Sequence, residues 1–162
     1  MLNIVTRTVA VTTSDGSRIS AFVAEPERQG RYPVIVFGQE AMGFNAFGRD
    51  IAERLAAEGF FTVTPDYYRG TGPTRPDDYT DFSEVFAAIG ALDFRQATYD
   101  LIAAADWARS QSNVDPERVF TWGYCTGGTL AMMAACLDRR LAGAVLYFPS
   151  QPRFETLDAR HP

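Results

Sequence analysis

Hydrophobic and polar residues follow two kinds of spacing along the chain, which divide it into predicted strands and helices. Near the start, TRTVAVT and RISAFVA alternate β-branched and polar residues, and the turn sequence SDGS separates them. This pattern predicts a β-hairpin. Short apolar runs, typical of strands buried on both faces, follow later. They are VIVF (34–37), FFTVTP (60–65), RVFTWG (118–123) and AGAVLYF (142–148).

Between these runs, apolar residues recur at the spacing of an α-helix. The helices predicted in this way are residues 47–57, 83–92, 93–110 and 126–137. The order β-β-β-α-β-α-α-β-α-β predicts an α/β fold, a mostly parallel twisted sheet with helices on both faces. The chain has no internal repeat, low-complexity tract or linker, so we expect residues 1–162 to form a single domain, or part of one.

Composition narrows the class of protein. The chain has 162 residues, of which 46% are hydrophobic and 13% aromatic, and these values are typical of a globular domain. The net charge is −5 and the basic residues are scattered, which argues against a nucleic-acid surface. No apolar run approaches the roughly 20 residues that a membrane span needs, and the start lacks the pattern of a secretory signal. We therefore expect no membrane partner and a cytoplasmic location.

The two cysteines are expected to be free thiols. Cys125 and Cys136 fall on the same predicted helix, which would separate them by about 16 Å. A disulfide needs Cα atoms within about 7 Å. No cluster of cysteine and histidine has metal-ligand spacing, so we expect neither a metal nor another cofactor.

The sequence GYCTGG places Cys125 between a predicted strand and a predicted helix. Gly-x-Cys-x-Gly-Gly in that position has the form of a nucleophile elbow, with Gly123 and Gly127 relieving close contacts. A cysteine at a helix N-terminus is favoured as thiolate, and the backbone N–H of Thr126 would form half of an oxyanion hole. The alternative is a structural cysteine in a glycine-rich turn. Cys136, on an apolar helix face, is expected in the core.

A second candidate element follows the strand VIVF, in the loop GQEAMGFN (38–45). In α/β-hydrolase folds the loop at this position supplies the other oxyanion N–H, which here would be that of Ala41. Glu40 follows the carboxyl end of a central strand, so we expect its side chain to face the nucleophile. The alternative for Glu40 is a solvated loop acid.

With these residues identified, the chain resembles the dienelactone hydrolase family of α/β-hydrolases. The matching segments are QEAMGFNAFGRD (39–50), TPDYYRG (64–70), DLIAAADWARSQ (100–111) and WGYCTGG (122–128). The resemblance implies that Cys125 is the nucleophile, that Glu40 interacts with the thiol and that backbone donors lie around Ala41 and Thr126. It also implies hydrolysis of a small-molecule ester or lactone. Arg49 matches a family arginine, and we expect it to organise the loop around Glu40.

The chain departs from the family pattern in two places. Family members specific for dienelactone carry substrate-binding arginines in a region that corresponds to residues 81–92, where this chain has none. A neutral ester or lactone is therefore at least as good a candidate substrate as an anionic dienelactone. In addition, the family's catalytic aspartate and histidine belong to strands downstream of this sequence. The single histidine, His161, corresponds to a residue at the entry of the next strand.

The match to the N-terminal two-thirds of the family pattern predicts an open sheet edge at residues 142–148. We expect a homodimer or a complementing C-terminal segment to cover this edge. A stable truncated fold is a further alternative. For function, the alternatives are a non-catalytic binding or interaction module, an inactive fragment, and a thiol-redox protein that uses Cys125.

Overall fold

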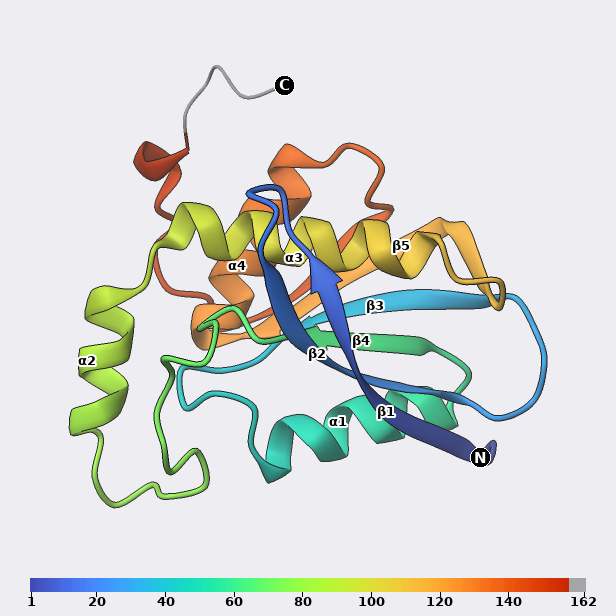
Figure 1. The fold of residues 1–162 in the computed structure, drawn as a ribbon, viewed down its shortest axis with the longest axis horizontal. Coiled ribbons are helices and arrows are strands. Elements are labelled where there is room, and N and C mark those ends of the chain that lie inside the picture. Colours follow the sequence, from blue (N-terminus) through green and yellow to red (C-terminus); the bar gives the residue numbers. More distant parts are fainter. Residues whose placement is uncertain (158–162) are drawn as a thin grey trace.

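The computed structural model describes residues 1–157 and shows a six-stranded sheet with helices on both faces (Figure 1). The strands are β1 (Ile4–Thr12), β2 (Arg18–Pro26), β3 (Tyr32–Gly38), β4 (Phe61–Pro65), β5 (Val114–Tyr124) and β6 (Gly143–Tyr147). The helices are α1 (Ala46–Ala57), α2 (Ser83–Ala91), α3 (Phe94–Arg109) and α4 (Cys125–Leu137), followed by a short 3₁₀ turn at Phe154–Thr156. The predicted α/β fold and its order of elements are confirmed.

The sheet has the spatial order β1-β2-β4-β3-β5-β6. The hairpin β1–β2 is antiparallel and β2 pairs antiparallel with β4, whereas β4, β3, β5 and β6 run parallel. In the register of β3 with β5, Gly38 lies opposite Gly123. The carboxyl ends of these two strands therefore meet at one edge of the sheet, which brings the loop after β3 next to the start of α4.

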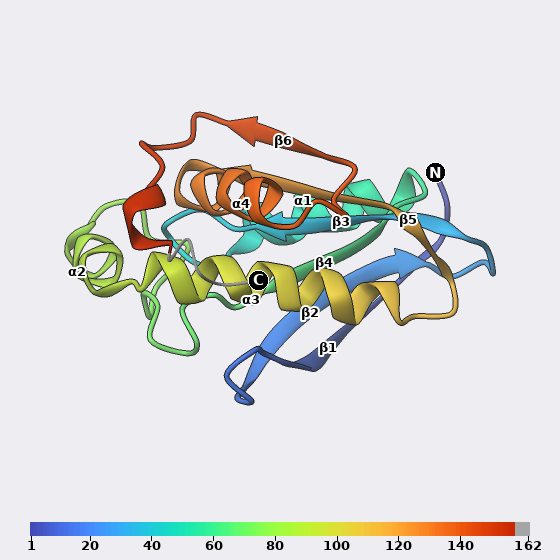
Figure 2. The same ribbon diagram turned by 90° about the horizontal axis from the view of Figure 1, so that it is seen from above.

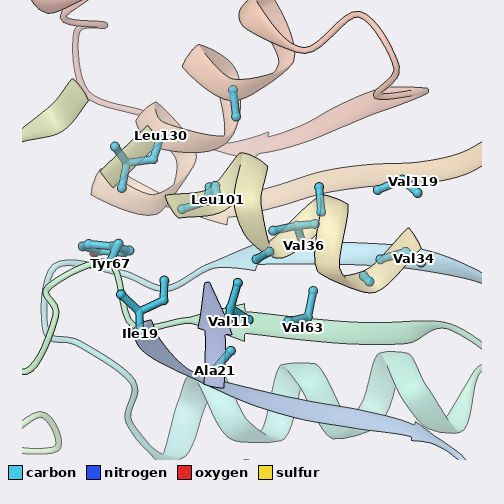
Figure 3. Close-up of a cluster of buried hydrophobic side chains, with 14 of the residues drawn as sticks. Val11, Ile19, Ala21, Val34, Val36, Val63, Tyr67, Leu101, Val119 and Leu130 are labelled. Carbon is cyan, nitrogen blue, oxygen red and sulfur yellow. The ribbon is translucent and has the colours of Figure 1, made fainter. Parts of the chain in front are cut away.

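The main core lies between the sheet and helices α3 and α4 (Figure 3). Val34, Val36 and Val63 from the central strands pack there with Leu101 of α3 and Leu130 of α4. On the other face of the sheet, α1 covers β2 and β4 through a smaller cluster of Phe22, Ala24, Ala52 and Ala56. Figure 1 shows α1 on one side of β3 and β4, and α3 on the other.

Strand β6 forms one end of the sheet (Figure 2). Its only strand partner among the described residues is β5. Three apolar side chains at this edge are exposed: Val145 by 38%, Tyr147 by 40% and Phe148 by 76%. The open edge expected from the sequence is present, and its cover by a second copy or a further segment stays a prediction.

Within residues 1–157, no helix is both long enough and apolar enough to cross a lipid bilayer.

An ion-pair network ties the N-terminal hairpin to α3. The guanidinium of Arg69, in the loop after β4, donates 2.8 Å and 2.7 Å hydrogen bonds to the two carboxylate oxygens of Asp100 in α3. It also donates to Asp15 in the turn between β1 and β2. The side chain of Asp100 is fully buried. Burying a carboxylate is costly unless it is paired, so the fold depends on Arg69 at this point.

Replacing Arg69 by methionine should therefore destabilise the protein strongly. Asp100 would remain buried without its charged partner, with only the amide of Gln96 still donating to it, and loss of the partner of a buried charge typically costs about 3–5 kcal/mol of unfolding free energy. The matched control is Arg54→Met, because Arg54 pairs with Asp50 on the exposed surface of α1, where a pair contributes about 0–1 kcal/mol. Urea denaturation of both variants measures the difference. Equal midpoints would contradict this role for Arg69.

Candidate active site

Cys125 occupies a strained turn between β5 and α4. It is the first residue of α4 and its φ angle is 51°, in the left-handed region that residues other than glycine rarely adopt. Such a conformation costs on the order of 1–3 kcal/mol and persists only where the surroundings enforce it. The side chain is half-buried and the thiol is free. The elbow geometry that the sequence predicted is present.

Three glycines enforce this turn by allowing direct contact between backbone segments. A Cβ atom on Gly123 would overlap the carbonyl of Gly127, and a Cβ on Gly127 would overlap the backbone of Gly38 and Gln39. A Cβ on Gly38 would in turn approach the Gly127 carbonyl oxygen to 2.6 Å. The end of β3, the end of β5 and the first turn of α4 therefore pack backbone against backbone, and any side chain at these positions would separate them.

The N-terminus of α4 has no side-chain cap. The N-cap residue Tyr124 makes no side-chain hydrogen bond to the first turn, whereas Asn45 caps α1 and Asp93 caps α3 in the ordinary way. The first N–H groups of a helix have no acceptor inside the helix, and Thr126 belongs to this group. Its N–H therefore has no acceptor within the helix, and its role in an oxyanion hole stays a prediction.

Two tyrosines hold the loop after β3. Tyr67 donates hydrogen bonds to the carbonyls of Gln39, at 3.1 Å, and Glu40, at 3.0 Å. Tyr68 donates a 2.9 Å hydrogen bond to the carbonyl of Ala41. In a planar trans peptide the Ala41 N–H points opposite to the Glu40 carbonyl, so anchoring that carbonyl also fixes the direction of the N–H. Sequence analysis identified the loop and missed the tyrosines that hold it.

The same tyrosines lie within electrostatic range of the thiol. Burial raises the pKa of Tyr67 well above its ordinary value, and the charges of Tyr68 and Cys125 add to this effect. Burial likewise raises the pKa of Tyr68 to about 12, with Cys125 contributing. The candidate nucleophile and the anchors of the candidate oxyanion loop therefore belong to one site.

The Glu40 carboxylate, in the same loop, is hydrogen-bonded to two other side chains. One carboxylate oxygen accepts from the amide of Asn45, at 2.8 Å, and from the hydroxyl of Tyr79, at 2.7 Å. Among residues 1–157 no hydrogen bond joins Glu40 to the sulfur of Cys125, so the expected contact between the two stays a prediction. Burial, together with the Glu40 carboxylate, raises the pKa of Tyr79 to about 12. The hydroxyl of Tyr79 is therefore neutral at ordinary pH and donates its hydrogen bond to the Glu40 carboxylate.

One other sequence-based expectation is wrong, one stays a prediction, and one falls outside the described residues. Cys136 is exposed, which makes the core assignment wrong: the buried face of the last turns of α4 carries Met133 and Ala134, and Cys136 lies outside it. The guanidinium of Arg49 lies over the ring of Phe44 in the loop that contains Glu40, and its expected role in organising that loop stays a prediction. His161 lies outside the described residues.

Within the described part of the chain, no group of three or more potential metal ligands gathers at one place.

Comparison with known proteins identifies a family that the chain matches. Residues 19–162 match the dienelactone hydrolase family. A Synechocystis protein named "Putative carboxymethylenebutenolidase" is 31% identical over 96% of the chain, and the Pseudomonas putida protein named "Carboxymethylenebutenolidase" is 33% identical over 80%. The crystal structure of a "Putative Dienelactone Hydrolase" from Klebsiella pneumoniae superposes with a TM-score of 0.81 at 27% identity over 91% of the chain. The chain spans 64%, 56% and 61% of these three proteins, respectively.

Replacing Gly127 by alanine should disrupt the contact between α4 and the end of β3. The added methyl group overlaps backbone atoms that cannot rotate away, and overpacking of this kind costs about 1–3 kcal/mol or more. Gly90→Ala in α2 is the matched control. A Cβ there meets no atom within 4 Å, so this helix substitution should stabilise by about 0.5–1 kcal/mol. Urea denaturation compares them, and a Gly127→Ala variant as stable as the parent would refute the backbone contact.

Stability should fall at alkaline pH because of the buried tyrosines. The Tyr68 pKa is about 12 in the folded protein and about 10 in an unfolded chain. The neutral hydroxyl therefore contributes fully below pH 10, and its contribution is lost as the pH rises toward 12. The chain contains no lysine that would titrate in the same range.

Tyr68→Phe should accordingly lower the thermal midpoint at pH 8, since a hydrogen bond is typically worth about 0.5–1.5 kcal/mol. The same variant should flatten the fall in midpoint between pH 10 and 12. Thermal melts of parent and variant at several pH values measure both effects. Equal steepness in the two proteins would contradict the raised pKa.

Proposed function

The chain belongs to the dienelactone hydrolase family, and we propose from this membership and the geometry of the site that it hydrolyses carboxylic esters or lactones with Cys125 as nucleophile. The observation that carries the proposal is the left-handed backbone of Cys125 at an uncapped helix N-terminus, next to a loop held by Tyr67 and Tyr68. Backbone donors placed before the reaction are effective stabilisers of a developing oxyanion.

The first half of the proposed reaction uses groups within residues 1–157. The thiol of Cys125 loses its proton to water, the thiolate attacks the carbonyl carbon, and the electron pair of the C=O double bond moves onto oxygen. The N–H groups of Ala41 and Thr126 bind that oxygen, near the N-terminus of α4 where negative charge is favoured. Collapse of the tetrahedral intermediate breaks the bond to the alcohol oxygen, which takes up a proton, and leaves a thioester on Cys125.

The second half of the reaction requires a base to activate water. Attack of water on the thioester carbon releases the carboxylic acid and restores the thiol. A general base contributes about 10²–10⁴-fold to such a step, and histidine is the most common one. The described residues include no histidine. We therefore propose that residues 1–157 carry out acylation faster than deacylation, and that the base for deacylation comes from outside them.

The proposed substrate is a neutral ester or lactone. Arg75 lies shortly before the segment that carries substrate-binding arginines in dienelactone-specific relatives, and Asp78 and Asp81 already pair with it. The segment itself forms α2, where Phe86 is 72% exposed. These features support an apolar, uncharged substrate better than an anionic dienelactone.

The alternative functions have weaker support. A non-catalytic module gives no reason for a strained cysteine at an uncapped helix start, because a glycine in the same turn would avoid the strain. For a thiol-redox function, the other cysteine of the chain, Cys136, lies near the far end of α4. The expected cytoplasmic location and a single domain over residues 1–162 stay predictions.

Mixing the protein with 4-nitrophenyl acetate should release nitrophenolate in a rapid burst of about one equivalent, followed by slow turnover. Mass spectrometry of the quenched protein should find one acetyl group on Cys125. Cys125→Ala should abolish the burst and the adduct, whereas Cys136→Ala, which removes the other thiol, should retain both. An undiminished burst in Cys125→Ala would reject the proposed nucleophile.

A further inference from the structure

The carboxylate of Glu40 is held by side chains from two separate parts of the chain. Its oxygen Oε1 accepts from the amide of Asn45 at 2.8 Å and from the hydroxyl of Tyr79, 39 residues later, at 2.7 Å. The amide of Asn45 has a fixed orientation, because its oxygen caps α1 by accepting from the N–H of Gly48. One donor to Glu40 therefore belongs to the start of α1, and the other to the loop of residues 71–82.

Three contacts fix this loop on the start of α1. The amide of Asn45 donates to the hydroxyl oxygen of Tyr79 at 2.8 Å and to the carbonyl of Pro76 at 3.3 Å. The carboxylate of Asp77 accepts from the first backbone N–H of α1 at 2.9 Å. Tyr79 itself is 51% exposed, so its ring contributes little to the core. What distinguishes it from a phenylalanine here is the hydrogen bond of its hydroxyl to Glu40.

The main chain of Glu40 is held as well. Its carbonyl accepts 3.0 Å hydrogen bonds from the hydroxyl of Tyr67 and from the backbone N–H of Gly43. This carbonyl belongs to the same planar peptide as the N–H of Ala41, the proposed oxyanion donor. The carboxylate and the carbonyl are thus two separate anchors of Glu40. Together they restrict the rotation about its backbone bonds that would turn the N–H of Ala41 to another direction.

We propose that Tyr79 is a positioning residue for the N–H of Ala41 and acts through the carboxylate of Glu40. The inference rests on the proposed hydrolysis, since it concerns the group that binds the oxyanion of that reaction. Without the hydroxyl of Tyr79, the loop of residues 71–82 loses its link to Glu40, and the N–H of Ala41 gains freedom of direction. A donor that is no longer preorganised stabilises the oxyanion less, so acylation slows although the ester still binds.

Burst kinetics of a Tyr79→Phe variant test the inference, because this substitution removes the hydroxyl and keeps the ring. With 4-nitrophenyl acetate, the maximal burst rate constant should fall about tenfold, while the ester concentration that gives half of it should change less than about twofold. The matched control is Tyr32→Phe. The hydroxyl of Tyr32 donates to the carbonyl of Arg28 at the start of β3, away from Glu40, so this control should keep the parent's burst.

Two further measurements distinguish positioning from a general structural effect. Iodoacetamide is attacked by the sulfur of Cys125 at a CH₂ carbon and releases iodide, so no oxyanion forms. In a Cys136→Ala background, which leaves Cys125 as the one thiol, Tyr79→Phe should be alkylated at the parent's rate. In a double-mutant cycle with Glu40→Ala, Tyr79→Phe should slow the burst by less than about twofold, because the residue through which it acts is gone.

The outcomes separate this inference from the proposed function. A parent protein without a burst at Cys125 would overturn both. A normal parent burst with an unchanged rate constant in Tyr79→Phe would overturn the positioning role alone. Equal slowing of the burst and of alkylation, or additive effects of Tyr79→Phe and Glu40→Ala, would also contradict it, since the hydroxyl would then act on the whole site or by a route that bypasses Glu40.

Discussion

The candidate site depends on a contact between backbones at the junction of β3, β5 and α4. Gly38, Gly123 and Gly127 are close enough that a methyl group on any of them would collide with main-chain atoms. That contact holds the first turn of α4 against the sheet and keeps Cys125 in a left-handed conformation that an isolated turn would relax. The position of the thiol is thus set by atoms that have little freedom to move.

The hydrogen bonds of Tyr67 and Tyr68 extend this rigidity to the opposing loop. Both tyrosines follow β4, and their hydroxyls donate hydrogen bonds to three successive carbonyls, those of Gln39, Glu40 and Ala41. The nearby Arg69–Asp100 pair connects the same segment to α3. The loop that would supply one oxyanion donor is therefore positioned by β4 and α3, while the other donor belongs to α4.

The sequence predicts the fold well because its signals are local. Alternation, short apolar runs and helical spacing identify every strand and helix in order, and the turn SDGS fixes the antiparallel hairpin. The elbow is also predictable, since Gly-x-Cys-x-Gly-Gly confines the necessary residues to one turn. The prediction that Cys136 lies in the core is wrong because α4 is apolar on all sides. Helical periodicity therefore cannot distinguish the buried face of α4 from its exposed face.

The remainder of the site could not be predicted because it depends on contacts between distant segments. Glu40 meets Tyr79 only through the path of the loop of residues 71–82, and no pattern near Glu40 signals that partner. The sequence PDYY contains both tyrosines, but nothing in it shows that their hydroxyls donate hydrogen bonds to carbonyls about 27 residues earlier in the chain.

The most direct test of the central claim is a crystal structure of the protein bound to an apolar trifluoromethyl ketone, whose carbonyl accepts a thiol to form a tetrahedral adduct. The account predicts a covalent bond to the sulfur of Cys125 and an adduct oxygen about 2.7–3.1 Å from the backbone nitrogens of both Ala41 and Thr126. An unmodified sulfur, or an adduct oxygen directed away from these two groups, would contradict it.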